Sequence, residues 1–149
     1  MGLKAGSSIP EFSLKDQEGN WFHSRDHLGT PMVIFFYPKD FTPGCTAEAC
    51  AFRDAYEDFV EAGALVVGIS SDSESSHRKF TQKLQLPFTL LSDPEAKVRR
   101  KFRVENRLLN LLPGRETFVV DRKGKGVMAF EGLRASGHVP HALKALEKL

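Results

Sequence analysis

The feature that most constrains the fold is a junction between an apolar run and a helix start. Residues 31–37 read Pro-Met-Val-Ile-Phe-Phe-Tyr, and such an unbroken run is typical of a strand covered on both faces in a mostly parallel sheet. Thr42 can then cap a helix whose first residue is Pro43, and apolar positions recur at helical spacing as far as Ala62. The junction therefore predicts a buried strand, a loop and a helix in direct succession.

Strand and helix patterns continue to alternate along the chain. The other expected elements are a hairpin within 12–22, a strand at 64–69, a helix at 72–84, a strand at 88–91, a helix at 93–102, strands at 117–120 and 127–130, and a helix at 140–149. This alternation indicates βαβ crossovers, and the last two strands are expected to form an antiparallel hairpin. Residues 1–149 are therefore predicted to form one α/β domain, a thioredoxin-like α/β/α sandwich with an N-terminal hairpin.

The composition excludes several classes of function. The chain has 149 residues, of which 41% are hydrophobic, and this is enough for a substantial core. Its net charge of +2 is spread along the sequence, which does not favour nucleic acid or a membrane surface as a partner. The apolar run at 32–37 is far shorter than the ~20 residues of a membrane span, and the N-terminus has no signal or transit pattern. Of the classes of function considered, chemistry on small molecules is the one that the composition leaves open.

Both cysteines of the chain, Cys45 and Cys50, lie near the expected helix start. Cys45 falls in the first turn, where free backbone N–H groups and the positive end of the helix dipole favour thiolate over thiol. Two cysteines are too few for a disulfide scaffold, and this indicates a reducing compartment. Their spacing does not match a common zinc site, although five histidines are available. Cysteines on a helix are often only small buried apolar residues. Both a reactive pair and two structural core residues therefore stay open as interpretations at this point.

Short motifs over nearly the whole chain carry a further signal. They are Tyr37-Pro38, Thr42-Pro43-Gly44-Cys45, Glu48, Cys50 and Arg115-Glu116-Thr117-Phe118, together with segments 68–70, 86–93 and 112–115. These motifs closely resemble the peroxiredoxins and, within them, the Q type, also called bacterioferritin comigratory proteins. The segment Leu-Pro-Gly-Arg at 112–115 looks most like that of plastid and cyanobacterial members.

The resemblance implies thiol-dependent reduction of hydrogen peroxide and organic hydroperoxides, with no cofactor and no metal. It implies that Cys45 is the peroxidatic cysteine, that Cys50 is the resolving cysteine of an intrasubunit disulfide, and that thioredoxin or a glutaredoxin-like protein is the reductant. A monomer is expected, without nucleic acid or membrane partners. The expected location is the cytoplasm or, if a transit peptide has been removed, the stromal or thylakoid side of a plastid.

The chemistry of peroxide reduction independently requires an ionised sulfur and fixed hydrogen-bond donors near both peroxide oxygens. The backbone N–H groups of Gly44 and Cys45 and the hydroxyl of Thr42 can supply these donors. Arg115 is expected to add a permanent positive charge that favours the thiolate and stabilises the transition state.

Three further residues are expected to support the site. Pro38 is expected to screen the oxidised sulfur from water and stray thiols, and Tyr37 precedes it in the motif. By the resemblance, the carboxylate of Glu48 holds Arg115 in place.

The spacing of the two cysteines makes a conformational prediction. On an intact helix, residues five apart have Cα atoms about 8.6 Å apart, beyond the limit of about 7 Å for an unstrained disulfide. A bond between Cys45 and Cys50 therefore requires the first turns of the helix to unwind.

Two other functions fit the same residues: a redox carrier or thiol sensor with little turnover, and an inert thioredoxin-like binding domain. Three expectations concern other segments. Arg99, Arg100 and Lys101 are expected on a solvated helix face, His138 and His141 on a polar face near the last helix, and the leucine cluster at 108–112 in a lid over the site.

Overall fold

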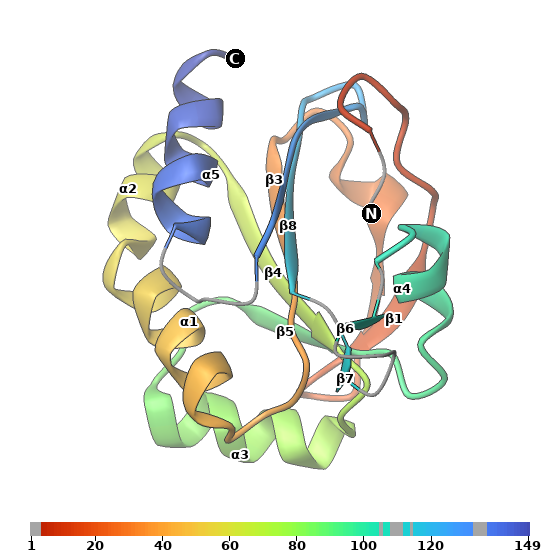
Figure 1. Ribbon diagram of the computed structural model, residues 1–149, viewed down its shortest axis with the longest axis vertical. Helices are drawn as coiled ribbons and strands as arrows, with labels where there is room; N and C mark the ends of the chain where they lie inside the picture. The colour runs from red at the N-terminus through yellow and green to blue at the C-terminus, as the bar shows by residue number, and fades with distance from the viewer. Residues whose placement is uncertain (1–3, 105, 108–111, 114, 133–136) are drawn as a thin grey trace.

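A mixed seven-stranded sheet separates two layers in the computed structural model, which describes residues 4–104, 106–107, 112–113, 115–132 and 137–149 (Figure 1). The strands lie in the order β2-β1-β5-β4-β3-β8-β9. Their bounds are β1 Ser13–Asp16, β2 Trp21–His23, β3 Met32–Phe36, β4 Leu65–Ser70, β5 Thr89–Ser92, β8 Glu116–Val120 and β9 Gly126–Glu131. Two short strands, β6 (Asn106–Arg107) and β7 (Leu112–Pro113), pair separately.

Strand β3 is an interior strand of this sheet, between β4 and β8. It pairs in parallel with β4, and β4 pairs in parallel with β5, as the βαβ pattern predicts. On its other side β3 pairs antiparallel with β8, which forms a hairpin with β9. All five residues of β3 are buried, which confirms the prediction of a strand covered on both faces.

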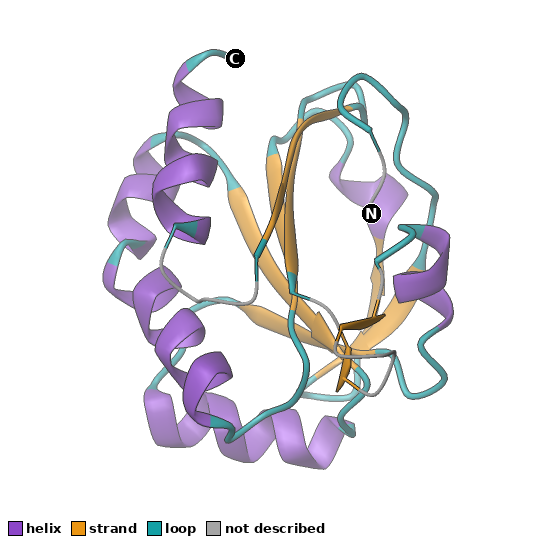
Figure 2. Cartoon of the chain, in the orientation of Figure 1, coloured by secondary structure: helices purple, strands orange, loops and turns teal. Residues whose placement is uncertain are grey.

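Helices cover both faces of the sheet unequally (Figure 2). Their bounds are α1 Pro43–Asp54, α2 Tyr56–Glu61, α3 Glu74–Leu84, α4 Lys97–Lys101 and α5 His138–Glu147, with a 3-10 turn at Ser24–His27. Helices α1, α2, α3 and α5 contribute to one core, and α4 packs on the other face with the β1–β2 hairpin. The predicted α/β/α sandwich is confirmed. Within the residues described, no helix has the length and apolar character that a membrane span requires.

Alternate residues of β3 belong to different cores, because successive strand side chains point to opposite faces. Phe35 stacks on Phe52 of α1 with ring centroids 4.4 Å apart. Phe36 faces the other layer, where it contacts Phe102 and Phe118. These aromatic contacts fix the position of α1 relative to the end of β3.

Several boundaries differ from those that the sequence predicts. The helix expected at 43–62 is two helices that break at Ala55. The helix expected from Asp93 begins only at Lys97, because Ala96 has a left-handed backbone and the Asp93 carboxylate accepts the N–H groups of Val98 and Arg99. Asp93 therefore caps this helix from outside its first turn. The leucine cluster at 108–112 lies outside the described side chains, so its expected role as a lid stays a prediction.

We expect Gly68→Ala to destabilise the fold. A Cβ at Gly68 in β4 would lie 2.6 Å from Cζ of Phe35 and 2.8 Å from Cδ2 of Leu90, so both core side chains would have to move. Overpacking of this kind costs about 1–3 kcal/mol. Gly126→Ala is the matched control, because its nearest neighbour would be Ser7 O at 3.7 Å. Urea unfolding measures both variants, and equal midpoints would contradict the prediction.

Candidate active site

The candidate active site lies where the carboxyl end of β3 meets the N-terminus of α1. Chemistry in open α/β sheets gathers at such strand ends. Pro43 is the first residue of α1, as predicted, which places Cys45 in the first turn. The expected Thr42 side-chain cap is absent, because the Thr42 hydroxyl donates to the carbonyl of Lys39 at 2.8 Å instead.

The Cys45 thiol is buried, with 2% of the residue exposed. Its Sγ accepts two hydrogen bonds, one from the backbone N–H of Lys39 and one from Nη2 of Arg115, both at 3.5 Å. The N–H groups of Gly44 and Cys45 occupy the helix start, where an α-helix has no carbonyls to receive them. Positive charge and free donors therefore surround this sulfur, which is the environment of a reactive thiolate.

Arg115 and Glu48 form a buried ion pair next to this sulfur. Nη1 of Arg115 donates to Oε1 of Glu48 at 2.6 Å, while Nη2 points to Cys45. Burial raises the pKa of Glu48 to about 7, although the neighbouring Arg115 charge acts in the opposite direction. Burial also opposes the charge of Arg115, but Glu48 and Cys45 outweigh it and hold the arginine pKa above its usual value. The expected contact between these two residues is present.

Gly44 and Cys50 occupy different places around the pair. A Cβ at Gly44 would lie 3.0 Å from Nη2 of Arg115, so the glycine leaves room for the guanidinium beside the helix start. Cys50 is half-buried further along α1, and both cysteines are free thiols. Pro38 is half-buried in the loop between β3 and α1.

His138 and Thr117 extend the site behind Glu48, and sequence reasoning missed both roles. Nδ1 of His138 lies 2.7 Å from Oγ1 of Thr117 and 3.5 Å from Oε2 of Glu48. His138 is completely buried, so its expected place on a polar face is wrong. Burial lowers the pKa of this imidazole to about 4, and Arg115 acts in the same direction. The contact with Glu48 is therefore not an ion pair at neutral pH.

A second buried network holds the loop before α1. The Tyr37 hydroxyl donates to Asp40 at 2.6 Å, and Oδ2 of Asp40 lies 2.7 Å from Nδ1 of His77. Burial raises the pKa of Tyr37 well above its usual value, and Asp40 adds to this effect. The sequence did not predict this network, because its two most distant members, Tyr37 and His77, are forty positions apart.

Asp40, Asp72 and His77 are close enough to be considered as metal ligands, with one donor atom from each within 4.8 Å of the others. Both ring nitrogens of His77 already have partners, since Nε2 lies 2.9 Å from the carbonyl of Leu91. The carboxylate of Asp72 likewise accepts from Ser70 and from the N–H of Asp40. The three residues therefore serve as a hydrogen-bonded clamp for the loop.

The structure also corrects the expected exposure of Arg99. It was expected on a solvated helix face with Arg100 and Lys101, but it is buried, whereas these two neighbours are exposed. Its Nη2 donates to the carbonyl of Tyr37 at 3.1 Å. A hydrophobic-face count over a helix of only five residues could not reveal this inward orientation.

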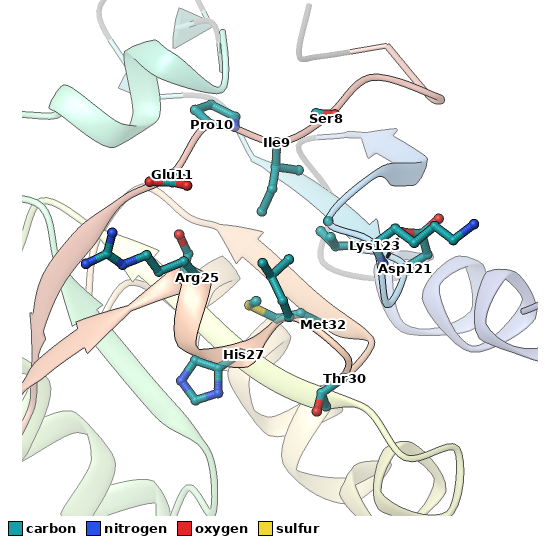
Figure 3. A pocket seen from close by; sticks show the side chains of 14 residues that line it. Ser8, Ile9, Pro10, Glu11, Arg25, His27, Thr30, Met32, Asp121 and Lys123 are labelled. Atoms are coloured by element: carbon teal, nitrogen blue, oxygen red, sulfur yellow. Dashed lines mark hydrogen bonds between the residues drawn. The ribbon is translucent and has the colours of Figure 1, made fainter.

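A cavity at the other end of the sheet is separate from this site. It has a volume of about 190 Å³ and lies between the first residue of β3, Met32, and the last of β8, Val120. Figure 3 shows Met32 among the side chains that line it. Cys45 follows the opposite end of β3. The cavity therefore has no contact with the chemistry described above.

Comparisons with known proteins agree with this geometry. Residues 5–127 match the AhpC/TSA family. The chain is 50% identical over 145 residues to the chloroplastic peroxiredoxin Q of Sedum lineare, which covers 97% of this chain and 78% of the relative. It is 46% identical over 146 residues to the chloroplastic peroxiredoxin Q of Arabidopsis thaliana, and the alignment covers 97% of this chain and 68% of that relative.

Solved structures give the same result. Peroxidoxin BcpB from Mycobacterium tuberculosis has a TM-score of 0.91 and 36% identity, with 99% of this chain and 98% of that chain covered. Xanthomonas campestris peroxiredoxin Q has a TM-score of 0.89 and 34% identity, with 97% of each chain covered. The chain therefore belongs to the AhpC/TSA family and, within it, to the peroxiredoxins of the Q type.

Proposed function

We propose that Cys45 reduces hydrogen peroxide and organic hydroperoxides and then forms a disulfide with Cys50 in each catalytic cycle. Membership of the family makes the chain a thiol peroxidase that uses a peroxide and a thiol reductant. One observation carries the assignment to Cys45: its Sγ lies in the first turn of α1, 3.5 Å from a guanidinium nitrogen of Arg115.

In the first step the Cys45 thiolate attacks one oxygen of the peroxide. The S–O bond forms as the O–O bond breaks, so the sulfur is oxidised to sulfenic acid, and the departing oxygen leaves as water or an alcohol after it takes up a proton. Negative charge moves from the sulfur to the departing oxygen. Arg115 and the N–H groups at the start of α1 are fixed donors that stabilise this charge.

The Thr42 hydroxyl has a defined direction in this step. Its proton is directed to the carbonyl of Lys39, so its oxygen is an acceptor and not the donor to peroxide that the sequence predicts. We assign it to the O–H group of the incoming peroxide. Pro38, half-buried in the same loop, shields the sulfenic acid, and Tyr37 holds the loop through Asp40.

The second step requires α1 to unwind locally. Cys45 and Cys50 both lie within α1, whose intact geometry keeps them about 8.6 Å apart at Cα. Phe41, at the N-terminal end of the helix, has a φ of 65°, which is strained for a bulky residue. Further along, Phe52 is anchored in the core against Phe35. We therefore place the unwinding between Thr42 and Phe52.

A partner dithiol then reduces the disulfide by thiol–disulfide exchange. We propose a thioredoxin or a glutaredoxin-like protein as this partner, and a monomer as the active form, because both sulfurs belong to one chain. The plant relatives are named as chloroplastic proteins, which supports a plastid location for this chain.

A thiol sensor with little turnover is the alternative, and a coupled assay separates the two. Wild type, Cys45→Ser and Cys50→Ser are tested for peroxide consumption with thioredoxin, thioredoxin reductase and NADPH. We expect sustained turnover in wild type and none in Cys45→Ser, because the attacking sulfur is lost. Cys50→Ser is expected to be oxidised once and then to stop. Oxidation of wild type by a single equivalent of peroxide, without turnover, would favour the sensor.

Hydrogen exchange tests the unwinding. Amides from Cys45 to Arg53 are expected to exchange much faster in the oxidised protein than in the reduced one, because the disulfide is incompatible with the helix. Helix α5 is the internal reference and is expected to be equally protected in both forms. Equal protection of residues 45–53 in the two redox states would rule out the mechanism.

Arg115→Gln is expected to slow peroxide reduction by about 10²–10³-fold, because a charged donor to the reacting sulfur is lost. Arg115→Lys is expected to fall between this variant and wild type, since it keeps the charge but not the two-pronged geometry. Arg122→Gln, at an exposed position, is the control and is expected to react like wild type. Stopped-flow peroxide consumption measures all three, and an unchanged rate in Arg115→Gln would refute the role.

A further inference from the structure

A line of polar contacts runs from the reactive sulfur to the start of α5. Arg115 bridges Cys45 and Glu48 through its two terminal nitrogens, at 3.5 Å and 2.6 Å. Oε2, the second oxygen of Glu48, lies 3.5 Å from Nδ1 of His138. Glu48 and His138 are both completely buried. Among the described residues, Oε2 makes no hydrogen bond.

The contacts of His138 define which of its nitrogens carries a proton. Nε2 lies 3.0 Å from the carbonyl oxygen of Gly132, which can only accept, so Nε2 must be the donor. Nδ1 of the neutral ring is then a lone pair, and the Thr117 hydroxyl at 2.7 Å donates to it. Nδ1 therefore offers no proton to Glu48, and a buried carboxylate oxygen faces a nitrogen lone pair.

One additional proton removes this conflict. A proton on Oε2 can be donated to Nδ1 of His138, which converts two opposed acceptors into a hydrogen bond. Burial favours the neutral carboxyl, and the pKa of Glu48, raised to about 7, agrees with uptake of this proton near neutral pH. Since the pKa of His138 is lowered to about 4, the proton belongs mainly to Glu48.

Other charged and titratable groups face this pair from neighbouring elements or lie close to it in the sequence. Arg115 faces Glu48 from the segment before β8, and the ring of His141 approaches His138 from the same helix, with its Nδ1 2.7 Å from the carbonyl of Gly137. Glu116 and Glu131 face each other across β8 and β9. Because Glu116 is adjacent to Thr117 in a strand, its side chain belongs to the opposite face of the sheet.

We propose that His138 is a positioning residue of the peroxide site, which acts through Glu48: one proton is held between Glu48 Oε2 and His138 Nδ1, and its presence sets the charge that Cys45 encounters. With the proton bound, the Glu48–Arg115 pair has a net charge of +1. Without it, the carboxylate cancels the guanidinium charge. The importance of this charge for catalysis rests on the proposed function of Cys45.

Protonation of Glu48 changes how the site responds to acid. As the pH falls through about 7, Glu48 takes up the proton, and the uncancelled charge of Arg115 then faces the negative charge that moves from the sulfur to the departing oxygen. Peroxide reduction therefore declines less steeply toward acid than it would beside a permanently ionised Glu48. Thr117 limits the effect, because its hydroxyl competes with Glu48 for the lone pair on Nδ1.

Two variants of the reduced protein shift this ionisation in opposite directions. Thr117→Val has nearly the same shape but frees Nδ1 to accept the proton on Glu48, so the Glu48 midpoint is expected to rise. His138→Asn places an amide near the former Nδ1, where its N–H can donate to the carboxylate, so the midpoint is expected to fall. A hydrogen bond gained or lost corresponds to a shift of about half to one pH unit.

Infrared difference spectroscopy reads the protonated Glu48 carboxyl directly as a function of pH, with Glu48→Gln as the reference that lacks the band. The wild-type midpoint is expected at about 7. The rate of peroxide consumption over the same pH range should have an inflection that follows this midpoint in each variant and is absent from Glu48→Gln.

The results that would overturn the proposal are specific. It fails if Thr117→Val and His138→Asn shift the carboxyl midpoint in the same direction, or if neither shifts it, since general loosening of the core would act alike in both. If His138→Asn does not fold, Thr117→Val alone decides, and an unchanged or lower midpoint refutes the proposal. Absence of peroxide turnover from wild type would refute the proposed function instead, because the infrared midpoints require no activity.

Discussion

Arg115 reaches Cys45 through a gap that a glycine leaves and is held there by the buried carboxylate of Glu48. Two charges removed from water are costly unless each has a close partner, and Arg115 donates both to Oε1 of Glu48 and to the sulfur of Cys45. The sheet fixes the positions of Cys45 and Arg115 relative to each other. Strand β3 delivers the chain to α1, and the adjacent β8 follows directly after Arg115, so both parts of the site depend on one pair of neighbouring strands.

Reactivity and mobility depend on the same helix. The first turn of α1 surrounds the sulfur with donors, and the intact helix keeps Cys50 away from it. Hydrogen bonds from Asp40 to Tyr37 and His77 hold the loop before the helix, while Phe52 anchors the turn beyond Cys50. In the proposed cycle, the short segment between these two fixed ends unwinds and re-forms while both cores stay intact.

Much of this could be predicted from the sequence. The buried strand at 31–37, the Pro43 helix start and the alternation of strands and helices are local patterns, because backbone propensity and side-chain period act over a few residues. The motifs around Cys45 and Arg115 added the family. Predictions were wrong where contacts over long distances in the sequence decide the outcome, as for the buried side chains of Arg99 and His138.

The sequence by itself determined the fold class, the family, and the position of both cysteines in one helix, because each follows from local patterns or from motifs. Only the tertiary structure decided which charged and polar side chains become buried together. Glu48, Thr117 and His138 come from three different elements, and their residue types are ordinary on a surface. Burial in one place alters the proton affinities of Glu48 and His138, since the cost of an unpaired charge depends on surroundings that distant segments provide.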